Sequence, residues 1–348
     1  MSEERHIPTV FDIAREAGVS RGTVDRVLHN RGRFSEKTAA RIKDAVRRLG
    51  YSANPNAALL ASRKSYLLAC LLPSYHEGEY WELMAKGIGC GIDECKGYNL
   101  EARMFLYDQT DIADFRRQCD SILDGEKPSA VLMNVVFRED VIAFAGKLEE
   151  AGIPFAFIDN KVDGLGNFLY VGIDPYRSGE LGAFLLTLPG TPEEIGLVRL
   201  LRDKGHRGDP NEPRRKGFCD YISAHFPDCK VHTVFIDPAR PVNIRETLEG
   251  FLSAHPGISR IAMTNSRIHL LSDTLHAHPE LTAVGFNDLE KNLKALKDGS
   301  VDFLVTHGIE AQAKLTIHLI ADYLVKGIDP QPREHFIHLD ILHRLNFD

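Results

Sequence analysis

Residues 9–30, TVFDIAREAGVSRGTVDRVLHN, decide how this chain begins to fold. Thr9 is a hydroxyl residue with Asp12 three positions later, which is a variant of the capping box that starts a helix. Gly18 supplies the backbone freedom that a helix end needs, and Ser20 is suited to cap a second helix. Because the apolar residues recur at helical spacing, the pattern predicts two short helices joined by a tight turn.

Two short helices across a glycine turn make a helix-turn-helix, whose second helix can enter the major groove of DNA. Any small αα-hairpin is the alternative. Ser35 is placed to cap a third helix that ends near Gly50, so three helices can close a small core. The basic residues outside the apolar stripe of this third helix form either a solvated face or phosphate contacts: Arg41, Lys43, Arg47 and Arg48.

The charge of the chain is divided unevenly along its 348 residues. Residues 1–66 hold thirteen Lys and Arg against seven Asp and Glu, a balance of +6, whereas the remainder holds 29 against 42, a balance of −13. A basic head on an acidic body fits a polyanion-binding module attached to domains with another task. A chance asymmetry of solvated faces is the alternative.

The stretch YSANPNAALLASRKS, residues 51–65, follows the third helix. Asn54 and Pro55 break regular structure, and the apolar residues after them are too few for a helix that persists alone in water. Leu59 and Leu60 have no local partner, which is unusual for a plain linker. We expect a segment that folds only against DNA or a second copy of the chain.

The run from Thr9 to Leu28, the S-E-K-T at residues 35–38 and the L-G-Y-S-A-N-P-N-A-A-L-L at residues 49–60 resemble the lactose-repressor (LacI) family of bacterial transcription regulators. The resemblance implies that the second helix reads bases and that the hinge becomes helical on operator DNA. Leu60 matches a leucine that is wedged into the minor groove. The implied DNA-binding residues are Thr9, Ser20, Arg21, Gly22, Thr23, Arg26, Asn30, Asn54, Ala57 and Leu60.

Two residues depart from the pattern of that family. Gly22 has no side chain, so we expect Arg21 to carry more of the base readout, because arginine with guanine is the commonest specific contact. Asp25 stands where a small hydroxyl residue is usual, and its carboxylate would repel phosphate. Asp25 is therefore expected to face Arg21, Arg26 or a cytosine amino group.

From Tyr66 onward, short apolar runs alternate with helical patterns, which predicts βαβ units and parallel sheets flanked by helices. Two such series imply two α/β lobes with a cleft between them, similar to the type I periplasmic sugar-binding fold. We expect a DNA-binding domain over residues 1–50, a hinge over 51–66 and an effector domain over 67–348. Lobe 1 is assigned about 67–165 and 307–328, and lobe 2 about 166–306 and 329–348.

Ligands of parallel α/β sheets bind beyond the carboxyl ends of the strands. That rule and the resemblance together select the candidate effector-binding residues Tyr80, Trp81, Asp159, Asn160, Arg214, Asn265, Asn287 and His307. Planar or forked polar side chains can make paired hydrogen bonds to the hydroxyl groups of a sugar, and an aromatic ring can cover the apolar face of the sugar ring. A strand-end or loop-solvating role is the alternative for each, and Asp174 is expected to cap a helix.

Signatures of enzymes, cofactors and metals are missing from the sequence. Gly87, Gly89 and Gly91 do not have dinucleotide-binding spacing, and there is no P-loop, GxSxG or HExxH motif. The six cysteines show no CxxC pair and are expected to be reduced. The histidines near residues 276–278 and 335–343 lack partners at ligand spacing. We therefore expect no enzyme activity, no cofactor and no metal.

The sequence predicts a cytoplasmic transcription regulator, a repressor by expectation, because it has no signal-peptide or bilayer-spanning run. Its expected partners are near-palindromic operator DNA, a sugar or sugar-derivative effector, and a second copy of the chain, with a higher oligomer still open. A membrane is not expected. The alternative is a soluble sugar-binding or sugar-modifying protein whose basic head serves assembly.

Overall fold

The computed structural model describes residues 8–28, 32, 34–49, 64–200, 211–238, 240 and 242–347. Two units make up the chain, Met1–Ser62 and Arg63–Asp348. In the smaller unit, α1 (Val10–Ala17), α2 (Arg21–Leu28) and α3 (Glu36–Leu49) surround a core in which Ile13, Val24 and Ile42 are fully buried. This confirms the predicted helices.

Local chemistry sets the ends of α1. The Thr9 and Asp12 side chains accept from each other's backbone N–H, at 3.4 Å for Thr9 Oγ1 and 2.9 Å for Asp12 Oδ2. Gly18 ends the helix with φ of 61°, a left-handed conformation in which a Cβ is unfavourable. The capping box and the glycine stop are therefore present as expected.

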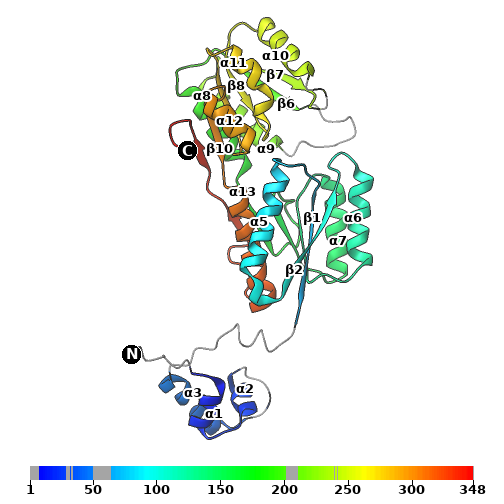
Figure 1. Cartoon of the computed structure of the whole chain (residues 1–348), viewed down its shortest axis with the longest axis vertical. Coiled ribbons are helices and arrows are strands. Elements are labelled where there is room, and N and C mark those ends of the chain that lie inside the picture. Colours follow the sequence, from blue (N-terminus) through cyan, green and yellow to red (C-terminus); the bar gives the residue numbers. More distant parts are fainter. Residues whose placement is uncertain are drawn as a thin grey trace. The chain divides into compact units, whose positions relative to one another are not determined.

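The larger unit contains two six-stranded sheets, each flanked by helices (Figure 1). Sheet A is parallel and has the strand order β11-β5-β4-β3-β1-β2. Its strands are β1 (Tyr66–Pro73), β2 (Leu100–Tyr107), β3 (Ala130–Met133), β4 (Phe155–Asp159), β5 (Leu169–Gly172) and β11 (Glu334–Phe336). Its helical segments are α5 (Tyr80–Glu94), η1 (Lys96–Tyr98), α6 (Ile112–Asp124), α7 (Arg138–Glu150), α13 (Ile309–Ala321) and η3 (Asp322–Lys326).

Sheet B has the order β12-β10-β9-β8-β6-β7 and is parallel except for β12. Its strands are β6 (Glu194–Leu200), β7 (Lys230–Ile236), β8 (Ile258–Met263), β9 (Thr282–Phe286), β10 (Phe303–Thr306) and β12 (Asp340–Leu342). Its helical segments are α8 (Pro175–Thr187), α9 (Glu212–His225), α10 (Val242–Ala254), η2 (Ile268–Leu271), α11 (Ser272–Ala277) and α12 (Glu290–Asp298).

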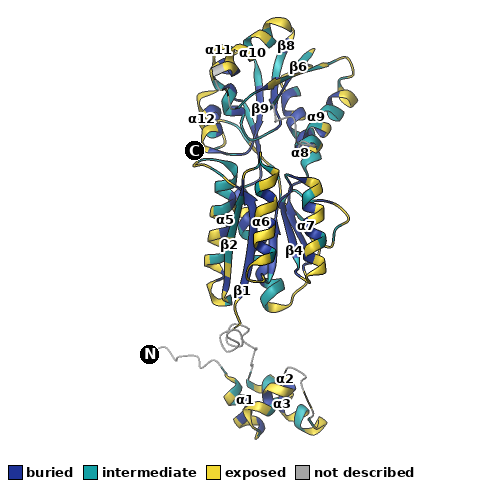
Figure 2. Cartoon of the chain, turned by 90° about the vertical axis from the view of Figure 1, so that its right-hand side faces the viewer, coloured by how far each residue is buried: buried dark blue, intermediate teal, exposed yellow. Residues whose placement is uncertain are grey.

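Both faces of each sheet are covered, so the strands are buried between helices (Figure 2). On β1, Leu68 and Cys70 face the cluster that includes α5 and α13, whereas Ala69 and Leu71 face the cluster that includes α6 and α7. A strand buried on both faces must be apolar at every position, which explains the run LLACLLP. The predicted two-lobed α/β fold is confirmed.

The sheet pairing moves two predicted lobe boundaries. Residues 166–172 were expected in lobe 2, but β5 pairs with β4 in sheet A, so the chain leaves this sheet only after Gly172. Residues 329–336 were also expected in lobe 2, but β11 pairs with β5. Both segments are short strands at one side of sheet A, with β11 at the edge and β5 next to it, where backbone pairing rather than sequence pattern decides which sheet they join.

Close packing of α8 on α9 depends on two glycines. A Cβ added at Gly217 would collide with the carbonyl oxygen of Tyr176, and one added at Gly179 would collide with that of Arg214. We expect Gly217→Ala to lower the free energy of unfolding by about 1–3 kcal/mol, because the helices must separate. Gly250→Ala in α10, where a Cβ meets nothing within 4 Å, is the control and should raise it by about 0.5–1 kcal/mol. Urea unfolding of the three proteins checks this, and equal stability of the two variants would contradict it.

Candidate functional sites

The surface of α2 carries the residues predicted to read DNA. Ser20 Oγ accepts from the Thr23 N–H at 3.3 Å and so caps the helix. Val24 and Val27 are buried, which turns Arg21, Gly22 and Arg26 outward, and Asp25 is exposed beside them. The helix therefore presents these side chains on one accessible face.

Arg21 and Arg26 are held differently on that face. The Arg21 guanidinium lies 5.0 Å from the ring centre of Phe11, which is itself 64% exposed. Arg26 folds back along the helix, where its Nε donates to the Gly22 carbonyl at 3.1 Å. A Cβ at Gly22 would meet nothing within 4 Å, so steric crowding does not explain the glycine.

Part of the basic surface of α3 has a structural role. Arg41 donates to the carbonyl oxygen of Ala17 and, at 3.5 Å, to that of Gly18, so it satisfies the end of α1. Arg48 pairs with Asp44 at 2.6 Å and with Glu16 at 3.5 Å. The sequence left two roles open for the basic residues of α3, a solvated face or phosphate contacts, and neither describes Arg41. Asn30, Asn54, Ala57 and Leu60 lie outside the described residues.

A second group of predicted residues gathers at the carboxyl ends of the strands of the larger unit. Asp159 ends β4 with φ of 71°, and its Oδ1 accepts from the Tyr80 hydroxyl at 2.5 Å. Burial raises the pKa of the Asp159 carboxyl, and the Tyr80 hydrogen bond and the Arg214 charge oppose that rise only partly. The carboxyl group is thus desolvated, and the Arg214 charge favours its ionised form.

Arg214 is the buried cation of this group, with an exposed fraction of 8%. Its Nε donates to Ser178 Oγ at 2.9 Å and its Nη1 to the carbonyl oxygen of Thr264 at 2.8 Å. The guanidinium carbon lies 4.4 Å from the ring centre of Phe286. Partners from α8, β8 and β9 therefore fix the plane of the guanidinium, which suits paired hydrogen bonds to a ligand.

Asn287 and His307 bring polar atoms that lack a hydrogen-bond partner among the described residues: Asn287 Oδ1 and His307 Nε2. Their exposed fractions are 5% and 4%. Burial lowers the pKa of His307 to about 4, and the nearby Arg214 charge adds to that effect. Buried polar atoms without partners are uncommon and costly, so their presence here indicates a place where a ligand can bind.

Tyr80 connects these side chains. Its hydroxyl meets Asp159, and its ring centre lies 6.5 Å from that of His307 and 5.0 Å from that of Trp81. Arg214 contributes to the electrostatics of Tyr80, Asp159 and His307 alike. We call five of the predicted residues the interlobe cluster: Tyr80, Asp159, Arg214, Asn287 and His307.

Three predicted residues are occupied by structural contacts. Asn160 Oδ1 accepts from the Val135 N–H at 2.6 Å, and its Nδ2 donates to the Val135 carbonyl at 2.9 Å. Asn265 Oδ1 accepts from the Arg267 N–H at 2.9 Å. Trp81 packs against the core cluster of lobe 1. Asn160 and Asn265 thus spend these polar atoms on backbone groups near the strand ends.

Sequence reasoning missed the residues that support the cluster. Ser178 and Thr264 hold Arg214, and neither carries a charge or motif that would mark it. Phe286 is the last residue of β9, and the strand-end rule selected only the next residue, Asn287. Arg267 was also missed, and it joins the two lobes through an ion pair of 3.3 Å with Glu79.

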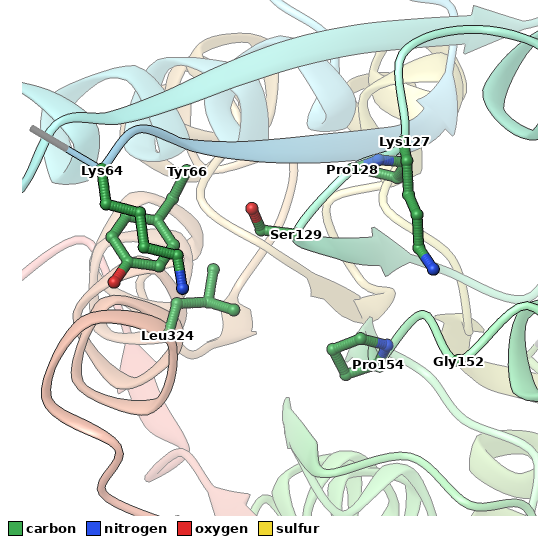
Figure 3. Close-up of a pocket in the computed structure, with 8 residues that line it drawn as sticks. All are labelled: Lys64, Tyr66, Lys127, Pro128, Ser129, Gly152, Pro154 and Leu324. Atoms are coloured by element: carbon green, nitrogen blue, oxygen red, sulfur yellow. The ribbon is translucent and has the colours of Figure 1, made fainter.

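A pocket of about 360 Å³ opens elsewhere, between Lys64, Tyr66, Lys127 and Leu324 (Figure 3). Tyr66 begins β1 and Pro154 precedes β4, so this pocket lies at the amino ends of the strands of sheet A. Ligands of parallel sheets bind at the opposite ends. We therefore keep the interlobe cluster as the candidate effector site.

Fold and site together define a two-lobed α/β binding domain preceded by a helix-turn-helix. Family models match both parts: the periplasmic binding protein domain over residues 69–328, and bacterial regulatory proteins of the lacI family over residues 9–54. The chain therefore belongs to the lacI family of bacterial regulatory proteins, as the sequence resemblance predicted. Within the described residues, no helix has the length and apolar character to cross a membrane.

Individual relatives agree with this assignment. The chain is 29% identical to the HTH-type transcriptional regulator DegA of Bacillus subtilis, over 60% of this chain and 59% of the relative. It is 26% identical to the sucrose operon repressor of Pediococcus pentosaceus, over 62% and 61%. These alignments thus span about three fifths of either relative. A crystal structure of a LacI transcriptional regulator from Bacteroides fragilis superposes with a TM-score of 0.76 at 26% identity, covering 81% of this chain and 98% of that one.

The raised pKa of Asp159 predicts a pH-dependent stability. Because the folded state disfavours the ionised carboxyl, stability falls as pH rises from the ordinary pKa through the raised one. We expect Asp159→Asn, whose amide oxygen can still accept from Tyr80, to be more stable than the parent at pH 7 and equal to it at pH 3. Asp220→Asn is the control of opposite sign, because Lys216 and Tyr176 lower the pKa of Asp220. Urea unfolding at both pH values checks this, and a destabilised Asp159→Asn at pH 7 would contradict it.

Proposed function

We propose that this protein is a transcription regulator, a repressor, that binds operator DNA through α2 and responds to a small carbohydrate held by the interlobe cluster. It acts as a cytoplasmic homodimer and catalyses no reaction. One observation carries the proposal: a chain with an exposed, capped helix-turn-helix also has, at the strand ends of a two-lobed domain, buried polar atoms that find no hydrogen-bond partner among the residues the structure describes. The name of the sucrose operon repressor supports a sugar as the effector class.

The chemistry of the cluster suits a polyhydroxylated ligand. Asn287 Oδ1 and the desolvated Asp159 carboxylate accept hydrogen bonds, and the Arg214 fork donates them. His307 is neutral at physiological pH because its pKa is lowered to about 4, so it can accept as well as donate. The Tyr80 ring offers an apolar surface to the face of a sugar ring, and the Trp81 ring packs edge-on against it.

Binding at this place would couple to DNA through the arrangement of the lobes. Tyr80 and Asp159 belong to lobe 1, whereas Arg214 and Asn287 belong to lobe 2, so a ligand that touches both sets favours one arrangement. In a dimer with two-fold symmetry, a change of arrangement alters the spacing of the two DNA-binding units. The size of the response equals the difference in affinity of the ligand for the two arrangements.

The DNA-binding role predicts a specific effect of Arg21. We expect Arg21→Ala to weaken binding to the preferred duplex by about tenfold or more while leaving binding to scrambled DNA nearly unchanged. Arg48→Ala, which removes an arginine paired with Asp44 and Glu16, is the matched control and should keep the sequence preference. Fluorescence anisotropy on a site selected from random duplex DNA, at several salt concentrations, measures both. No preference of the parent for any sequence would refute the DNA-reading role and favour an assembly head.

The effector role predicts which variants lose ligand binding. A thermal-shift screen of pentoses, hexoses, uronic acids and their phosphates should identify a ligand that raises the melting temperature. Arg214→Lys keeps the charge but not the fork, and Asn287→Gly removes the amide at a positive φ that glycine tolerates. We expect each to weaken that ligand at least tenfold. The exposed Arg177→Lys is the control. Unchanged shifts in Arg214→Lys and Asn287→Gly would show that the ligand binds elsewhere.

A further inference from the structure

Three side chains with metal-binding atoms meet in lobe 2, far along the strands from the interlobe cluster. Glu194 is the first residue of β6, His232 is the third residue of β7, and His255 directly follows α10. They therefore lie at the amino ends of the strands of sheet B. One ligand atom from each side chain lies within 4.8 Å of the other two. We propose that Glu194, His232 and His255 form a zinc-binding site.

The spacing between Glu194 and His232 fits an ion better than a hydrogen bond. Glu194 Oε2 and His232 Nε2 are 3.3 Å apart. His232 Nε2 is nevertheless buried and has no hydrogen-bond partner in the part of the chain that the structure describes. Zinc bonds of about 2.0–2.1 Å in a tetrahedron separate ligand atoms by about 3.4 Å. A zinc ion bound to both atoms would satisfy the buried nitrogen with almost no movement.

His255 supplies the third ligand after a small adjustment. Its ring stacks on that of His232 with centres 4.0 Å apart and planes inclined by 29°, and the Phe251 ring lies 5.2 Å away. Stacked rings do not aim their nitrogens at one point, so the His255 ring must turn about its side-chain torsion. Gly257 leaves room for the Glu194 carboxyl group, because a Cβ at this position would lie 3.0 Å from its carboxyl carbon.

The charges around the three residues favour a divalent cation. Glu194 contributes one negative charge, and both histidines bind metal in their neutral form. Lys230 competes, with its Nζ 4.0 Å from Glu194 Oε1, but its side chain is 72% exposed and can move into water. Two imidazoles and one carboxylate suit zinc and leave a fourth position for water, whereas magnesium prefers oxygen ligands alone. No residue of this site belongs to the interlobe cluster, so the inference is independent of the proposed function.

Zinc binding by the full chain, prepared without a histidine tag and freed of metal with a chelator, tests the site. Equilibrium dialysis should give one zinc ion per chain, and zinc but not magnesium should raise the melting temperature by about 5 °C. We expect His232→Gln, His255→Gln and Glu194→Gln each to weaken zinc binding at least tenfold. Lys230→Gln keeps all three ligands and should bind zinc more tightly.

The matched control is His278→Gln in the same lobe. Both nitrogens of His278 already contact carboxylates, Nε2 with Glu249 at 2.9 Å and Nδ1 with Glu280 at 3.0 Å. This variant should bind zinc as the parent does. The inference is overturned if the parent and His232→Gln bind zinc alike, or if His278→Gln loses zinc to the same extent. Weaker binding by Lys230→Gln would also overturn it, and this variant decides the matter if a ligand variant does not fold.

Discussion

The buried guanidinium of Arg214 is the interaction on which the larger unit depends most. It can sit at the strand ends only because Gly179 and Gly217 let α8 and α9 approach at backbone distance. A charge at this depth requires partners: Ser178 and Thr264 accept hydrogen bonds from it, and the Phe286 ring makes a cation–π contact. Burial and this charge together lower the pKa of His307, and the charge limits the rise in the pKa of Asp159. The packing of α8 on α9, the electrostatics of the buried side chains and the candidate site therefore all depend on where Arg214 lies.

In the smaller unit, the arginines divide between building the fold and facing outward. Arg41 and Arg48 are committed to the end of α1 and to carboxylates, whereas Arg21 and Arg26 lie on the exposed face of α2. The net charge of this unit therefore overstates how many of its basic side chains are available to bind phosphates. The stacking of Arg21 on the exposed Phe11 ring keeps this side chain extended over apolar surface, which lowers the entropy cost of ordering it against a base.

Much of this fold could be predicted because its signals are local. The capping box at Thr9, the glycine stop at Gly18 and the doubly buried run of β1 each act within a few residues. The strand-end rule also found Asp159 and Asn287, both of which adopt a positive φ. Sequence could not find what depends on distant partners: the bonds of Asn160 to Val135, the pairing of β5 and β11 in sheet A, or the spacing of Gly87 and Gly91, which face α13.

The contacts between the lobes show why a ligand can control their arrangement. Glu79 and Arg267 are each 33% exposed, and an ion pair of this kind contributes about 0–1 kcal/mol. The Tyr80–Asp159 bond lies within lobe 1, so it does not fix lobe 2. To move an equilibrium from 1:99 to 99:1, a ligand needs about 10⁴-fold selectivity between the two states, roughly 5.5 kcal/mol. Several charge-assisted hydrogen bonds at about 1.5–3 kcal/mol each reach that value, and the Glu79–Arg267 pair alone does not. Hydrogen bonds from a ligand to Arg214, Asn287 and His307 would therefore shift the equilibrium between the two lobe arrangements more than the Glu79–Arg267 ion pair does.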